Sequence, residues 1–135
     1  MNQDSIGKIL GIDYGSKRVG VAVSDEERKL AFPLSVISNT PDLFDEIAKI
    51  AAGSGAKELV LGESRDYKGE ANEILLDSLK FKQEMEKRGF AVTWEAEFMT
   101  SIQAERLQGK NAMTDASAAA LILQSYLDRQ GAEKT

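Results

Sequence analysis

The stretch that decides the fold is KILGIDYGSKRVGVAVS, residues 8–24. It opens with an apolar run, residues 8–14, and closes with a β-branched run, residues 19–24, in which small residues alternate with larger ones. Only the four residues GSKR separate the two runs. Two strand-like runs joined by so short a turn are typical of a β-hairpin. The sequence therefore predicts two antiparallel strands near the start of the chain.

The rest of the chain predicts an α/β fold. A third strand is expected at residues 30–37, at an edge of the sheet because Pro33 lacks the N–H group that a central strand needs. Thr40 is the expected N-cap of the first helix, which has Pro41 at its first position. The remaining pattern predicts helices at 41–52, 70–88, 100–109 and 114–129, and strands at 58–62 and 90–95.

This order predicts one mixed sheet of five strands. The first three strands should be antiparallel, whereas strands that follow helices should run parallel to the first. Helices should then cover both faces of the sheet. A length of 135 residues suits a single domain, and the tail at 128–135 is expected to be frayed. In such sheets ligands bind at the carboxyl ends of the central strands.

The composition restricts the chemistry. The chain has no Cys and no His, which excludes disulfides, thiolate nucleophiles, histidine general bases and His-ligated metals. An enzyme of this composition must rely on carboxylates, acting through a metal that prefers oxygen ligands. The net charge of −5 is unlike that of a simple basic nucleic-acid binder, so binding of nucleic acid would need a local basic patch or bridging cations.

The sequence also bears on location. No apolar run approaches the roughly 20 residues that span a bilayer, and the first ten residues lack the architecture of a signal peptide. We expect a cytoplasmic protein with no membrane partner.

Four acidic residues are candidates for a site at the carboxyl edge of the sheet. Asp13 ends an apolar strand, and Glu63 follows the next buried strand directly. Glu97 lies just past the strand at 90–95, and Asp115 opens the last helix. That helix continues with small residues, Ala116–Ala120, which would let it lie close to the sheet and bring Asp115 towards Asp13.

Each acid also has a simpler interpretation. Asp13 could cap the GSKR turn, and Asp115 could serve only the helix dipole. Either glutamate could be a solvated loop residue. Carboxylates that converge from several strand ends repel one another and need cations between them. An all-oxygen site suits Mg²⁺ or Mn²⁺, and two such ions about 4 Å apart can drive phosphodiester hydrolysis.

Three segments resemble motifs of the YqgF (RuvX) family. GIDYGSKRVGVAVSD at 11–25 is similar to its opening motif, EFMTSIQAERL at 97–107 to its D-E-R motif, and TDASAAALILQSYLDR at 114–129 to its final helix. The family is RNase H-like, and its members are described as Holliday-junction resolvases and as nucleases that mature pre-16S rRNA. The resemblance implies an RNase H-like fold, with Asp13, Glu97 and Asp115 at the acidic positions of a metal-dependent nuclease.

The chain departs from this family at two places. Where the family has D-E-R, residues 96–98 are A-E-F, so one acid and one base are missing. Where the family has G-L-P, residues 62–64 are G-E-S. Related resolvases of the RuvC type carry a catalytic glutamate at that strand end, so Glu63 could supply the acid that Ala96 lacks. The third metal ligand is therefore either Glu63 or Glu97.

Basic residues near the motifs could hold a nucleic-acid backbone, through contacts that neutralise phosphates. Those nearest the motifs are Lys17, Arg18, Arg65, Lys68, Arg106 and Lys110. Each of them could instead be an ordinary surface charge. The expected partner is pre-rRNA or branched DNA, bound by a monomer or a homodimer.

Two other functions stay open at this point. One is an inactive domain of the same fold that binds RNA or a protein. The other is an ATP-binding fragment of the actin and Hsp70 type, whose members also open with glycine-rich hairpins.

Overall fold

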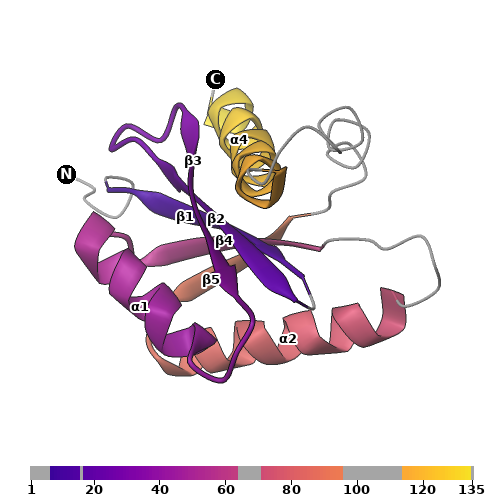
Figure 1. The fold of residues 1–135 in the computed structure, drawn as a ribbon. Coiled ribbons are helices and arrows are strands. Elements are labelled where there is room, and N and C mark those ends of the chain that lie inside the picture. Colours follow the sequence, from indigo (N-terminus) through magenta and orange to yellow (C-terminus); the bar gives the residue numbers. More distant parts are fainter. Residues whose placement is uncertain (1–6, 16, 64–70, 96–113, 135) are drawn as a thin grey trace.

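The structure, a computed structural model, describes residues 7–15, 17–63, 71–95 and 114–134. Its five strands form one mixed sheet in the order β3-β2-β1-β4-β5, with β1 in the centre (Figure 1). The strands are β1 (Ile9–Tyr14), β2 (Arg18–Ser24), β3 (Ala31–Ser38), β4 (Glu58–Glu63) and β5 (Ala91–Glu95). β1, β2 and β3 pair antiparallel, while β4 is parallel to both β1 and β5. The predicted sheet is thereby confirmed.

Helices cover both faces of the sheet, as predicted (Figure 1). α1 (Leu43–Ser54) and α2 (Ala71–Lys87) lie on one face, and α4 (Thr114–Lys134) crosses the other. Alternate strand residues supply the two cores. On the α1/α2 side the core contains Leu10, Ile12, Leu59, Leu61, Ile47 and Phe81, and on the α4 side it contains Ile9, Ala22, Val60, Ala119, Ile122 and Leu123.

Most boundaries lie within one or two residues of the prediction, and two assignments change. α1 begins at Leu43 with Asp42 as its N-cap residue, so the assignment of Thr40 as N-cap was wrong. Thr40 instead forms a turn before the helix, in which its carbonyl accepts the Leu43 N–H at 2.9 Å. α4 continues to Lys134 rather than ending near residue 129, so the tail expected to be frayed is helical. The helix expected at 100–109 lies outside the described residues.

β3 lies at an edge of the sheet, as Pro33 predicts. Just before Pro33, the backbone N–H of Ala31 donates to the Gln124 side chain of α4 at 2.9 Å. The Gln124 amide in turn donates to the Lys29 carbonyl at 2.9 Å. Helix α4 and a proline thus block the start of this free edge, which is one way in which native sheets avoid pairing with other chains.

α4 packs very close to the central strands because two of their residues are glycines. A Cβ atom at Gly11 would lie 2.7 Å from Leu123 Cβ and 2.9 Å from the Ala119 carbonyl oxygen. A Cβ atom at Gly62 would lie only 2.3 Å from Ile122 Cδ1. The expectation that α4 lies close to the sheet is confirmed, and glycines of the sheet contribute to it together with the alanines of the helix.

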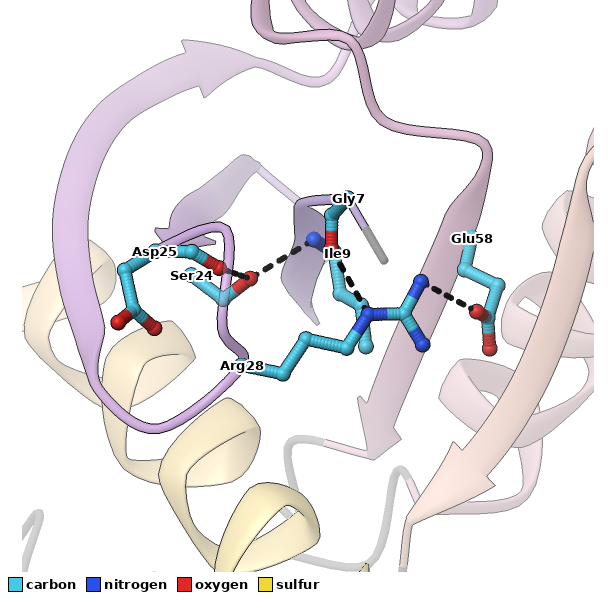
Figure 2. Close-up of polar contacts among 6 residues, drawn as sticks. All are labelled: Gly7, Ile9, Ser24, Asp25, Arg28 and Glu58. Carbon is cyan, nitrogen blue, oxygen red and sulfur yellow. Dashed lines mark hydrogen bonds and ion pairs between the residues drawn. The ribbon is translucent and has the colours of Figure 1, made fainter. Parts of the chain in front are cut away.

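A polar network fastens the end of the sheet at which β1 and β4 begin (Figure 2). The Arg28 guanidinium donates to the Gly7 carbonyl at 2.8 Å and pairs with Glu58 at 2.9 Å. Beside it, the Ser24 hydroxyl accepts the N–H of Ile9 at 2.9 Å. These contacts join the β2–β3 loop to β1 and β4. They hold the amino ends of these two strands in place, at the opposite end of the sheet from Asp13.

Candidate functional site

Asp13 lies at the carboxyl end of the central strand, as predicted. Only 9% of its surface is exposed. In the sheet register its neighbours are Gly20 on β2 and Gly62 on β4. Ile9 and Gly11, which share its side of β1, both contact α4, so Asp13 belongs to the face that α4 covers. Both register neighbours of Asp13 are glycines, so no side chain stands directly opposite this carboxylate in its row of the sheet.

The other predicted acids are placed only in part. Glu63 ends β4 opposite Tyr14, one position beyond Asp13 in the register, so the expected adjacency of these two strand ends is confirmed. Asp115 is in the first turn of α4. Glu97 lies outside the described residues. Within the described part of the chain, no three acidic residues form a group that could hold a metal ion. Whether the four predicted acids converge therefore remains a prediction.

Glu95 is a buried acid that the sequence analysis did not single out. It ends β5 and shares a register row with Gly62 and Asp13. Only 1% of it is exposed, and it pairs with Arg129 and accepts a hydrogen bond from Ser125 at 3.2 Å, both on α4. Burial raises the pKa of the Glu95 carboxyl, although the Arg129 charge acts in the opposite direction.

The position of Glu95 gives it a different role from Asp13. Ile122 sits over Gly62, which occupies the row between these two acids. Glu95 therefore fastens α4 to β5 rather than facing Asp13 directly. A glutamate that ends a strand under a helix needs a partner, but no local pattern in the sequence shows that this partner is Arg129.

Two of the predicted basic residues lie beside Asp13. Lys17 is exposed on the turn that joins β1 to β2, and Arg18 is exposed at the start of β2. Asn39 braces this turn, because its backbone N–H donates to the Lys17 carbonyl at 2.9 Å and its side-chain amide donates to the Gly15 carbonyl at 2.8 Å. The other predicted basic residues, Arg65, Lys68, Arg106 and Lys110, lie outside the described residues.

This edge of the sheet thus combines a buried carboxylate with cationic side chains on and next to the braced turn. Such an arrangement can hold a divalent cation at Asp13 and a phosphate group near the turn.

Comparison with known proteins identifies the family. The family model described as "RuvX: Holliday junction resolvase" matches residues 7–129. The chain belongs to the RuvX family. A relative from Paraburkholderia xenovorans, named as a candidate pre-16S rRNA nuclease, is 34% identical, and the match covers 89% of this chain and 87% of the relative. A relative from Endomicrobium trichonymphae with the same name is 32% identical, with 95% of this chain and 100% of the relative covered.

Solved structures show the same fold as this RuvX chain. RuvC of T. thermophilus, in complex with a Holliday junction substrate, has a TM-score of 0.63 at 16% identity, over 92% of this chain and 96% of that chain. The Fowlpox virus resolvase, in complex with Holliday junction DNA, has a TM-score of 0.55 at 13% identity, over 91% and 98%. The predicted family, α/β fold and nuclease class are confirmed. In the described part of the chain, no helix is long and apolar enough to cross a membrane.

Proposed function

We propose that this RuvX chain hydrolyses phosphodiester bonds in structured nucleic acid with the help of Mg²⁺ or Mn²⁺. The observation that carries the proposal is the buried Asp13 at the carboxyl end of the central strand, flanked by Gly20 and Gly62. A carboxylate at the carboxyl end of a central strand lies where sheets of this kind bind their ligands. Since the chain has neither His nor Cys, its donor set is all oxygen, which fits these two ions.

The residues divide between metal and substrate. Asp13 would hold the metal, together with Asp115 and with Glu63 or Glu97. When bound, the metal would activate a water molecule and stabilise the leaving oxygen. Lys17 and Arg18 would hold a phosphate of the substrate beside Asp13, so that the scissile bond stays at the edge of the sheet.

Structured RNA is the first candidate substrate, because two relatives more than 30% identical are named for pre-16S rRNA. Maturation of the 5′ end of this RNA is the proposed role, in the cytoplasm, and it needs only a monomer. The description of the family model supports Holliday junction DNA as the second candidate. Resolution of a junction needs two symmetric cuts and therefore a homodimer.

Cleavage of a defined substrate panel tests the proposal. Pre-16S rRNA fragments, duplexes and four-way junctions would be incubated with Mn²⁺ and wild-type protein, Asp13→Asn or Asp77→Asn, an exposed control on α2. Even changes in the outer shell of a metal site cost about 10–100-fold, so Asp13→Asn should lose more than about a hundredfold in rate. Asp77→Asn should cleave like wild type.

The outcomes separate the alternatives. Equal cleavage by Asp13→Asn and wild type would show that the site is elsewhere. Binding of RNA without cleavage by the wild type would indicate an inactive binding domain, and measured ATP binding would favour the actin and Hsp70 type.

A further inference from the structure

We propose that the groove between β3 and α1 binds the ribose-phosphate backbone of RNA, with Lys49 as the phosphate contact and Glu46 as the ribose contact. The groove has a volume of about 440 Å³. The hydroxyl residues Ser35, Ser38 and Thr40 line one wall, and Glu46 and Lys49 of α1 line the other. This inference rests on the proposed nuclease function and adds a binding subsite for its first candidate substrate, RNA.

The groove lies near the same end of the sheet as Asp13 but on the other face, since Asp13 faces α4 whereas the groove lies beside α1. Asp13, Gly20 and Val36 share one row of the sheet, and Val36 lines the groove. Two strand spacings separate β1 from β3, which is about 10 Å. Between them lies the turn with Lys17 and Arg18, which is hydrogen-bonded to the segment after β3. A strand held at Asp13 would have to cross this turn, from the α4 face to the α1 face, to enter the groove.

The chemistry of the two walls matches a sugar-phosphate backbone. Lys49 is exposed and forms no ion pair with any residue that the structure describes, so its charge is available to a phosphate. The three hydroxyls can donate hydrogen bonds to phosphate oxygens. Ile37 and Ile50 supply apolar surface between the polar groups. Asp45, the acid next to Glu46 on α1, differs from Glu46 because it is paired with Arg88 at 2.9 Å.

Glu46 makes the groove selective for RNA. An ionised carboxylate only accepts hydrogen bonds and repels phosphates, so it weakens binding of a backbone that offers no donor. RNA offers the 2′-hydroxyl as a donor, and this group is what distinguishes RNA from DNA at a given site. An acid beside a lysine and opposite a wall of hydroxyls therefore favours ribose over deoxyribose.

Binding measurements test this assignment. Fluorescence anisotropy would follow single-stranded RNA, DNA of the same sequence and 2′-O-methyl RNA, in an Asp13→Asn background that prevents cleavage. Lys49→Ala should weaken RNA and DNA alike and reduce the salt slope by about 0.7, the value for one phosphate contact on a single strand. Glu46→Ala should lower the preference for RNA over DNA by about tenfold, because a hydrogen bond to a charged group is lost.

Matched controls come from the exposed face of α2. Lys80→Ala and Asp77→Ala remove the same charges there and should leave the salt slope for DNA and the RNA preference unchanged. The 2′-O-methyl strand keeps the oxygen but loses the donor, so it should bind like DNA. The inference fails if Lys49→Ala behaves like Lys80→Ala, or if Glu46→Ala keeps the RNA preference of its parent.

The cleavage assay keeps the two proposals apart. If wild type and Asp13→Asn cleave equally, the proposed site is wrong even where Lys49→Ala weakens binding. If Asp13→Asn abolishes cleavage while Lys49→Ala and Glu46→Ala bind like their parent, only the groove is wrong.

Discussion

Gly62→Ala should destabilise the protein by forcing α4 away from the sheet. The new Cβ would lie 2.3 Å from Ile122 Cδ1 and 2.8 Å from both Ile122 Cγ1 and Cγ2, whereas ordinary contact begins at 3.4 Å. The largest overlap is therefore 3.4 − 2.3 = 1.1 Å. Ile122 is only 1% exposed, so it cannot turn into solvent. Overpacking of this kind costs about 1–3 kcal/mol, and the reduced freedom of the unfolded chain offsets about 0.4–1 kcal/mol of it.

Urea unfolding at equilibrium measures this effect, with Gly53→Ala as the matched control. Gly53 lies in α1 with no atom within 4 Å of an added Cβ, so this change should stabilise the protein by up to about 1 kcal/mol. Gly62→Ala should instead lower the unfolding midpoint. The reasoning is refuted if the two variants shift the midpoint in the same direction.

A double-mutant cycle identifies the cause. Ile122→Ala alone leaves a cavity and should cost about 2–5 kcal/mol. In Gly62→Ala/Ile122→Ala the added methyl group enters that cavity, so the double variant should be more stable than the sum of the single changes by at least about 1 kcal/mol. If the changes in the free energy of unfolding were additive, the new Cβ at position 62 would not be in steric conflict with Ile122.

Three further predictions concern ion pairs and the turn before β3. Arg129→Met should lower the free energy of unfolding by at most about 3 kcal/mol at pH 8, because Glu95 stays buried without its cation, although Arg129 itself is 56% exposed. This loss should shrink towards pH 5, because burial already raises the pKa of Glu95 and the carboxyl takes up a proton. Thermal melts at a series of pH values would measure the change. Hydrogen bonds from the Leu30 and Lys29 N–H groups lower the pKa of Asp25 below 3.8. Its contribution to stability is therefore present above that value and lost as pH falls through the lower folded pKa, so wild type and Asp25→Ala should differ in melting temperature at pH 7 and converge near pH 2. Arg28 has a left-handed φ of 61°, so Arg28→Gly should be more stable than Arg28→Ala by about 1 kcal/mol in urea unfolding; equal stabilities would show that this φ costs nothing.

Much of the fold could be predicted because its signals are local. The short turn at 15–18 permits only a hairpin, and Pro33 restricts its strand to an edge. The apolar run at 59–62 predicts a strand buried on both faces, and β4 is such a strand. Thr40 was a misleading signal, because its hydroxyl accepts the Asp42 N–H at 3.3 Å in a turn before the helix, and α1 begins only at Leu43, without a side-chain cap from Asp42.

The site could be predicted only up to the ends of its strands. Asp13 stands out because a carboxylate in an apolar run is costly, and that signal is contained within one strand. Glu95 has a similar position, but its partner Arg129 lies 34 residues further along the chain. No local pattern shows which distant side chain will meet a strand end, and the same is true of the groove between β3 and α1.

The close fit of α4 has a consequence for how the protein is made. The contact of Gly11 with Ala119 joins positions separated by nearly the whole described chain, and the helix is synthesised after all the strands it covers. A growing chain at the ribosome can pair its strands and pack α1 and α2. The face of the sheet that bears Asp13 stays exposed to solvent until the last helix is synthesised. Premature termination before that helix would leave an apolar surface without its cover, and such a product should aggregate rather than act.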